Sequence, residues 1–414
     1  MKIHKKFIKL PSAFVTLSIR NWFIFLRIMG VTVSLVIVKS TFAVSNDSFS
    51  LVSMTLHNEA LAGAHDVELS GDIAYVPGKW NSFSIIDISN PKIPDILWHL
   101  NHPSITDSET VLPLGNYLLL GTMDFLSLDV RDPRNPVFLK KVSERPRINK
   151  TKADPNAPKA HKYGHAEAIN GMVKVGDYVI AANKYGYIDA FDISDVRNPT
   201  LHGTIETRDQ FNLRAPHDVD RYGDYIVIVD PFKFAPPVGK LAIFKVAKQG
   251  EMLPVDQWVF MGKTEGKELI GANRVQVSGN HAFVGGSFSP AARKEAGPGT
   301  ADMTVVDISD PSNPTIVAAL PVSDVRGPNG LTIAGNIVFC AGGQTIDAYD
   351  ISDPTIPIHV ASQSFPVYRE TSRTDNYHDL IYRDGFLYIS AQSDNGFLIL
   401  KVEDEKIRTL AETK

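Results

Sequence analysis

The sequence predicts an all-β protein, a seven-bladed β-propeller of four-stranded blades whose N-terminal strand closes the last blade. Two recurring signals predict this fold. A turn of Gly with Asp or Asn occurs seven times, and an Asp-rich, Pro-rich segment occurs five times, each between short apolar runs. A unit of about four strands that recurs at a spacing of roughly fifty residues is typical of a propeller.

The first half of each unit is a short strand, a two-residue turn and a second strand. Gly beside Asn or Asp suits the positive φ values that tight hairpin turns need. The seven turns are Gly71-Asp72, Gly115-Asn116, Gly176-Asp177, Gly223-Asp224, Gly279-Asn280, Gly335-Asn336 and the reversed Asp384-Gly385. These turns predict seven units.

The second half of a unit contains the Asp-rich segment between two further strands. Asp and Ser cap tight turns through side-chain hydrogen bonds to the backbone, and Pro fixes φ, so the segment predicts a hairpin. The segments begin at Asp87, Asp129, Asp192, Asp307 and Asp350. Units four and seven carry Lys245 and Lys401 in place of this Asp. Five similar copies fit a structural cap better than a calcium site.

These segments resemble the LVIVD-repeat family. The resemblance rests on residues 83–91 (FSIIDISNP), 304–311 (TVVDISDP) and 348–354 (AYDISDP), and it extends over the chain from residue 50 to residue 405. It implies a propeller on a secreted, periplasmic or cell-surface protein. It implies no particular activity, because the family carries no shared catalytic motif.

The units place the blades at residues 64–100, 108–142, 168–206, 216–262, 272–321, 328–362 and 377–402. An apolar run at residues 49–56 resembles the fourth strand of a unit but precedes the first unit. We expect it to pair with the strand at 397–402, because this pairing conceals an exposed sheet edge. The tail at 406–410 is the alternative closing strand. Residues 44–414 would then form one domain.

The start of the chain differs in charge from the rest. Residues 1–43 hold seven Lys or Arg and no acid, which leaves 35 basic and 46 acidic residues and a net charge of −11 in the remainder. The chain starts with basic residues, continues with an apolar run at 28–38 and then has small residues before Ala43. This pattern predicts a signal peptide cleaved after Ala43, and therefore export. An uncleaved membrane anchor is the alternative. The acidic body makes nucleic acid a poor partner.

The long connections share one face of the predicted ring. They fall at 100–108, 143–168, 230–240, 286–302 and 366–376, between strands four and one or between strands two and three. Long loops on a rigid scaffold often carry function, so we expect the site on this face. Residues 140–162 hold eight Lys or Arg. They indicate either a solvated loop or a docking surface for an acidic envelope or surface partner.

A polar position recurs six residues before each turn. It precedes the strand expected to be innermost, so ring closure brings its seven copies to one mouth of the channel. This first column is His65, Glu109, Asn170, His217, Asn273, Asn329 and His378, and the next position, the second column, is Asp66, Thr110, Gly171, Asp218, Arg274, Gly330 and Asp379. Such residues either satisfy backbone groups at the strand ends or form a polar pocket for a small ligand.

Two classes of function remain. The first is a binding or scaffolding module with the pocket at the channel mouth. The second is a periplasmic enzyme with a metal or acid–base site there, since His65, His217 and His378 with flanking carboxylates are ligands suited to a divalent metal. No GxSxG, P-loop, HExxH or CxxC motif occurs in the chain. The single cysteine, Cys340, predicts a buried thiol on a strand and no internal disulfide.

Overall fold

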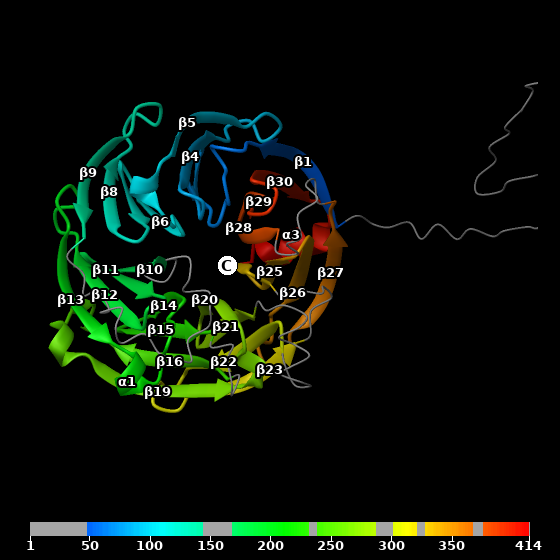
Figure 1. Cartoon of the computed structure of the whole chain (residues 1–414). Coiled ribbons are helices and arrows are strands. Elements are labelled where there is room, and N and C mark those ends of the chain that lie inside the picture. The colour runs from blue at the N-terminus through cyan, green and yellow to red at the C-terminus, as the bar shows by residue number, and fades with distance from the viewer. Residues whose placement is uncertain are drawn as a thin grey trace, which may run out of the picture. The chain divides into compact units, whose positions relative to one another are not determined.

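Seven antiparallel four-stranded sheets form a ring in the computed structural model, which describes residues 48–143, 168–231, 238–286, 301–320, 328–366 and 376–413 (Figure 1). These residues belong to one compact unit. The predicted signal peptide at 1–43 and most of the basic stretch at 140–162 lie outside the described residues. No helix within the described ranges is long and apolar enough to span a membrane.

The first three blades follow the chain in order. Blade one contains β2 (Glu68–Ser70), β3 (Ile73–Gly78), β4 (Ser82–Asp87) and β5 (Asp95–Asn101). Blade two contains β6 (Thr110–Leu114), β7 (Tyr117–Gly121), β8 (Phe125–Asp129) and β9 (Val137–Val142). Blade three contains β10 (Ile169–Val175), β11 (Tyr178–Asn183), β12 (Tyr187–Asp192) and β13 (Thr200–Glu206).

The next three blades repeat this order. Blade four contains β14 (Asp218–Tyr222), β15 (Tyr225–Asp230), β16 (Gly239–Lys245) and β19 (Val259–Gly266), with a hairpin of β17 (Ala247–Lys248) and β18 (Glu251–Met252). Blade five contains β20 (Ala272–Ser278), β21 (His281–Gly286), β22 (Met303–Asp307) and β23 (Thr315–Leu320). Blade six contains β24 (Gly330–Ala334), β25 (Ile337–Gly342), β26 (Thr345–Asp350) and β27 (Ile358–Ser364).

Blade seven joins the two ends of the chain. It contains β28 (Tyr377–Arg383), β29 (Phe386–Ala391), β30 (Gly396–Val402) and the N-terminal β1 (Phe49–Leu56), which pairs antiparallel with β30 from Phe49 opposite Val402 to Leu56 opposite Gly396 (Figure 1). Phe49 is fully buried, and its ring lies edge-on to Phe339 of blade six, with 6.3 Å between the centroids. The predicted closure is confirmed.

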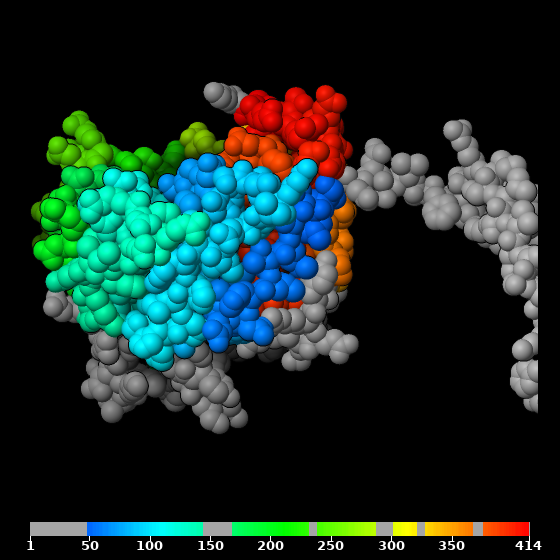
Figure 2. Space-filling model, turned by 90° about the horizontal axis from the view of Figure 1, so that it is seen from above, coloured from blue at the N-terminus to red at the C-terminus, as the bar shows by residue number. Residues whose placement is uncertain are grey.

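The chain ends in a helix, not a strand. α3 (Glu405–Ala411) is capped by Asp404, whose side chain accepts hydrogen bonds from the N–H groups of Lys406 and Ile407. The helix packs on blades six and seven, where the N–H of Asn336 donates to the carbonyl of Leu410. Figure 2, which views the ring from its side, shows α3 in red standing out from one face. The tail therefore does not compete with β1 for the closing position.

The five Asp-rich turns are structural caps. Oδ1 of Asp87 accepts the N–H of Ser89, two residues later in the chain, at 2.8 Å. The first Asp of each of the other four turns makes the same bond; these are Asp129, Asp192, Asp307 and Asp350. Unit four lacks this Asp, and there Asp224 of the Gly-Asp turn accepts the N–H groups of Gln249 and Gly250 in the β17–β18 hairpin. The capping role expected from the sequence is confirmed.

The hydrophobic core is divided among the blade interfaces. Seven clusters of buried side chains each combine residues from two neighbouring blades, with one cluster for every junction of the ring. Between blades two and three, for example, the rings of Phe125 and Phe191 stack with centroids 3.9 Å apart. Cys340 is a buried free thiol in the cluster between blades five and six, as expected.

In the described parts of the connections lie three short 3₁₀ helices and one short α-helix. They are η1 (Pro103–Ile105), α1 (Arg208–Phe211), η4 (Val255–Gln257) and η5 (Lys267–Leu269). All follow the fourth strand of a blade or, in blade four, precede it. The strand order is the same in every blade. Each inner strand therefore runs from the face of the long connections to the face of the Gly turns.

Candidate functional site in the central channel

Seven inner strands surround the channel, because each is the first strand of its blade and six of them pack on the inner strand of the next blade. The inner strands are β2, β6, β10, β14, β20, β24 and β28, and the contact from β28 to blade one is made by His378 and His65. An inner strand is a sheet edge with no strand partner toward the channel. Its backbone polar groups therefore need other partners. The two polar columns supply them.

Side chains of the first column form a belt around the channel. Nδ1 of His378 lies 2.8 Å from the carbonyl of His65, and Nδ1 of His65 lies 2.8 Å from the carbonyl of Glu109. Nδ2 of Asn170 donates to the carbonyl of His217 at 3.0 Å, and Nδ1 of His217 lies 2.9 Å from the carbonyl of Asn273. Nδ2 of Asn170 also lies 2.7 Å from Nδ1 of His217. Each of these side chains thus contacts the same position in the next blade.

His65 and His378 are neutral donors. A carbonyl oxygen only accepts, so the proton of His65 and of His378 is on Nδ1. The centroids of the two imidazole rings lie 3.7 Å apart. Burial lowers the pKa values of both histidines well below the usual range. Within the described part of the chain, no group of three or more His, Cys, Asp or Glu is arranged to hold a metal ion. The hypothesis of a metal at His65, His217 and His378 stays without support.

The belt continues through the amides of the first column. Nδ2 of Asn273 donates to Oδ1 of Asn329 at 3.1 Å. The remaining atoms, Oδ1 of Asn170, Oδ1 of Asn273 and Nδ2 of Asn329, are buried without a hydrogen-bond partner among the described residues. The first column therefore also joins blades five and six, through an amide pair.

Glu109 joins the belt as an acceptor. It is fully buried, and its carboxylate forms ion pairs with Lys79 of blade one, at 2.9 Å, and with Lys184 of blade three. Burial opposes the charge of Glu109, but the two lysines outweigh it and lower the pKa of the carboxyl to about 2. Blade two is thereby connected to both of its neighbours.

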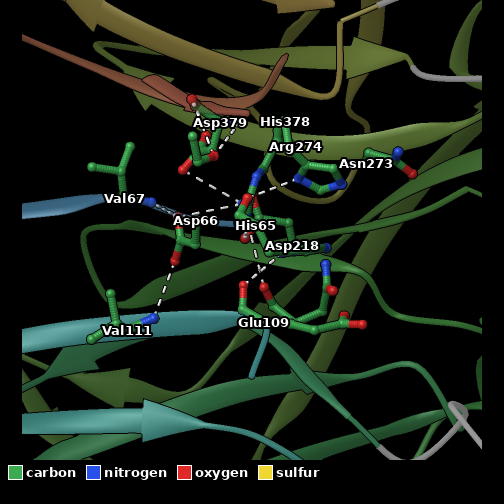
Figure 3. A network of polar contacts seen from close by, with 12 residues as sticks. His65, Asp66, Val67, Glu109, Val111, Asp218, Asn273, Arg274, His378 and Asp379 are labelled. Atoms are coloured by element: carbon green, nitrogen blue, oxygen red, sulfur yellow. Dashed lines mark hydrogen bonds and ion pairs between the residues drawn. The ribbon is translucent and has the colours of Figure 1, made fainter. Parts of the chain in front are cut away.

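The second column brings a buried arginine together with three aspartates. Nη2 of Arg274 lies 3.4 Å from Asp66 and 3.5 Å from Asp379, and Nη1 lies 4.0 Å from Asp218 (Figure 3). Burial disfavours the guanidinium charge, but these carboxylates outweigh it and raise the pKa of Arg274. The four residues come from blades one, four, five and seven, so only the closed ring assembles them.

The aspartates also hold the inner strands together. Oδ2 of Asp66 accepts the N–H of Val111 at 3.1 Å, and Oδ2 of Asp218 accepts the N–H of Val275 at 2.9 Å. Two residues further along β14, Oδ2 of Asp220 accepts the N–H of Val277 at 2.7 Å. Each carboxylate thus bonds to the edge of the next blade.

A cavity of about 360 Å³ begins at the Arg274 cluster and follows the inner strands toward the Gly turns. Its polar lining comes from two levels of the strands. The lining residues with polar side chains are Asp66, Glu68, Thr110, Asp218, Asp220, Arg274, Gln276, Ser278, Thr332 and Asp379. The cavity therefore extends away from the face of the long connections, where the sequence placed the site.

The sequence-predicted residues divide between these two features. Asp66, Asp218, Arg274 and Asp379 line the cavity. The lining does not include the seven first-column residues, which are His65, Glu109, Asn170, His217, Asn273, Asn329 and His378. Glu68, Asp220, Gln276 and Thr332 were missed, although alternation along a strand places a residue two positions onward on the same side.

Burial raises the pKa values of four carboxyl groups that line the cavity. Burial, followed by the charge of Asp66, raises the pKa of Glu68 to about 8. Burial outweighs Arg274 and raises the pKa of Asp218 to about 7. Burial also raises the pKa values of Asp220 and Asp379. The single positive charge of Arg274 is therefore not enough to keep all of the surrounding carboxyl groups ionised.

Comparison with known proteins identifies the repeat and the fold. A family model of the LVIVD repeat matches residues 63–97, 171–207 and 298–320. The search of curated proteins found no match. Among solved structures, the WD40 β-propeller domain of Doa1 matches with a TM-score of 0.53 and 9% identity over 86% of this chain and 98% of that one. The computationally designed Ika8 protein matches with a TM-score of 0.51 and 12% identity over 85% and 99%. Identities this low indicate a shared fold alone.

Proposed function

This chain is an LVIVD-repeat protein, and we propose that it is a binding module that takes a small organic cation into its channel cavity. The observation that carries the proposal is the charge of the lining. Five carboxyl groups, those of Asp66, Glu68, Asp218, Asp220 and Asp379, share one cavity with the single guanidinium of Arg274.

A cationic ligand suits this lining better than an anionic one. Arg274 already faces three aspartates, so little of its charge is left for an anion. The raised pKa values of Glu68 and Asp218 mean that protons supply part of the positive charge at pH 7. An ammonium or guanidinium group would replace those protons, and its N–H donors would make charge-assisted hydrogen bonds to carboxylate oxygens.

The same carboxyl groups favour a second candidate, an acid–base enzyme. A general acid or base is most effective when its pKa is close to the working pH. Glu68 and Asp218, with pKa values of about 8 and about 7, meet that condition inside a cavity of ligand size. The charge at residues 1–43 supports export, so we place either activity in the periplasm, in the medium or at the cell surface.

Isothermal titration calorimetry tests the proposal with 1,4-diaminobutane, agmatine and choline as cationic probes and succinate as the anionic probe. We expect a cation to bind and succinate not to bind. At pH 7.5, binding should release protons, and the measured enthalpy should therefore differ between phosphate and Tris buffers.

A matched pair of variants locates the binding. Glu68→Gln removes an ionisable carboxyl group from the cavity and should weaken cation binding by about tenfold, or 1.4 kcal/mol, and reduce proton release. Glu251→Gln removes a charge from the exposed hairpin of blade four and should change neither. Failure of all cationic probes to bind would overturn the proposal, and chemical turnover of a bound probe would favour the acid–base enzyme.

A further inference from the structure

Two lysines and a glutamate meet where blades one, two and three come together. Lys79 follows β3 of blade one, Lys184 follows β11 of blade three, and Glu109 precedes β6 of blade two. None of the three lines the Arg274 cavity. They are therefore a separate group, at the end of the inner strands opposite to the Gly turns.

One carboxylate serves both amines. Nζ of Lys79 lies 2.9 Å from Oε1 of Glu109, and Nζ of Lys184 contacts Oε2 of the same carboxylate. The Glu109 side chain is fully buried, whereas 27% of the Lys79 side chain and 16% of the Lys184 side chain are exposed. Both amines are thus anchored on a buried charge, and both lysine side chains are partly exposed.

An ion pair with Glu109 needs only one lysine. One ammonium would neutralise Glu109, and a second one costs desolvation and repulsion by the first. Asp107 also favours both ammonium groups, but less strongly than Glu109 does. An amine held beside another cation in a partly desolvated place gives up its proton easily and becomes a nucleophile at neutral pH.

We propose that Lys184 is a carbonyl-reactive lysine that forms an imine with a small aldehyde or ketone at the junction of blades one to three. The geometry assigns Lys184 as the nucleophile because its side chain is the more buried of the two, and Lys79 as the neighbouring ammonium.

The proton balance of the two amines agrees with these roles. Burial, together with the charge of Lys79, lowers the pKa of Lys184 to about 8, although Glu109 opposes the shift. Burial also disfavours the charge of Lys79, but Glu109 outweighs it and raises the pKa of Lys79, and a hydrogen bond to Lys184 adds to this. The ammonium of Lys79 therefore persists while Lys184 is partly neutral.

The reaction needs no oxidant or reductant. The neutral Nζ of Lys184 attacks the carbonyl carbon, a C–N bond forms, and the oxygen takes up a proton to give a carbinolamine. The C–O bond then breaks as the ammonium of Lys79 donates a proton to the leaving hydroxyl, and one water molecule departs. Nζ loses its two protons overall, and Lys79 regains its own from solvent.

Reductive trapping on the unmodified protein tests the inference. The folded protein is treated with pyridoxal at pH 7.5, reduced with sodium borohydride and mapped by peptide mass spectrometry. Lys248, exposed on the hairpin of blade four, is the internal reference. Lys184 should be labelled at least tenfold faster than Lys248. Its labelling rate should reach half of its maximum near pH 8.

Two variants separate nucleophilicity from simple access. Lys79→Met removes the neighbouring cation and leaves Glu109 to Lys184 alone, so labelling of Lys184 at pH 7.5 should fall and its midpoint should move to higher pH. Lys184→Arg keeps the ion pair and should abolish the rapid labelling. If Lys184 in the unmodified protein reacts no faster than Lys248, or if Lys79 is the labelled residue, the inference is overturned. Neither result depends on the Arg274 cavity.

Discussion

Gly330 and Asp379 occupy the same position in neighbouring blades, and the glycine makes room for the aspartate. A Cβ atom on Gly330 would lie 2.5 Å from Cα of Asp379 and 2.8 Å from its Oδ1. Gly171 stands in the same relation to Asp218, with 2.1 Å from its Cβ position to Oδ1. Each of the two glycines of the second column therefore leaves the space for a carboxylate that faces Arg274.

Gly330→Ala should destabilise the protein by about 1–3 kcal/mol, because backbone and side-chain atoms of Asp379 must move to admit a methyl group. Urea unfolding followed by tryptophan fluorescence measures the loss. Thr110→Ala is the matched control, since Thr110 occupies the same column and its Cβ already fits. An unchanged unfolding midpoint for Gly330→Ala would contradict the steric role of this glycine.

The belt of the first column predicts a difference between two substitutions of His378. His378→Ala leaves the buried carbonyl of His65 without its donor and should cost about 1–3 kcal/mol. His378→Asn should recover part of this loss, because Asn170 makes the equivalent bond to His217 in another blade. Thermal unfolding of both variants is the measurement. Equal losses would show that packing of the ring, and not its hydrogen bond, sets the stability.

The export prediction concerns the start of the mature chain. Protein recovered from the periplasm or the medium should begin near Val44, because the basic start and the apolar run of residues 1–43 are typical of a cleaved signal peptide. N-terminal sequencing of the secreted protein is the measurement. Recovery in the membrane fraction with Met1 still present would instead support the uncleaved anchor.

The fold was predictable from the sequence because each repeat carries its own turn chemistry. The Gly turns and the Asp caps are local signals, and they determine the number of blades and the order of strands. The closure by β1 was predictable because units one to six each carry a fourth strand, and the seventh copy stood alone at the start of the chain. The helix α3 was not, since its cap at Asp404 and its contact with Gly335 and Asn336 belong to no repeat.

The site was predictable in part, for a related reason. Aligning the units identified the positions of Asp66, Asp218, Arg274 and Asp379, because ring closure turns one column into one cluster. The same alignment did not separate the belt of His65 and the other first-column residues from the lining of the cavity. That separation depends on whether each side chain points into the cavity or toward the neighbouring blade. Lys79 and Lys184 follow second strands, so they share no column with Glu109, and only the packing of three blades brings them to it.

The buried carboxyl groups predict how stability depends on pH. Glu68 has a pKa of about 8 in the folded protein against a usual value of 4.5, and Asp218 has a pKa of about 7 against 3.8. The folded state thus binds more protons than the unfolded state between about pH 4 and pH 8. Stability contributed by these groups is present below that window and is lost as the pH rises through it.

Glu68→Gln tests this dependence because glutamine keeps the shape of the protonated side chain and cannot ionise. The free energy of unfolding, measured in urea at pH 5.5, 6.5, 7.5 and 8.5, should fall with pH in the unmodified protein and fall less in the variant. The variant should therefore gain stability relative to the parent as the pH rises. Glu109 has the opposite sign, since its lowered pKa confers stability that is lost only in acid, and it adds no slope in this range. Parallel curves for parent and variant would show that Glu68 is ionised in the folded protein and would remove the main support for a proton-linked cation site.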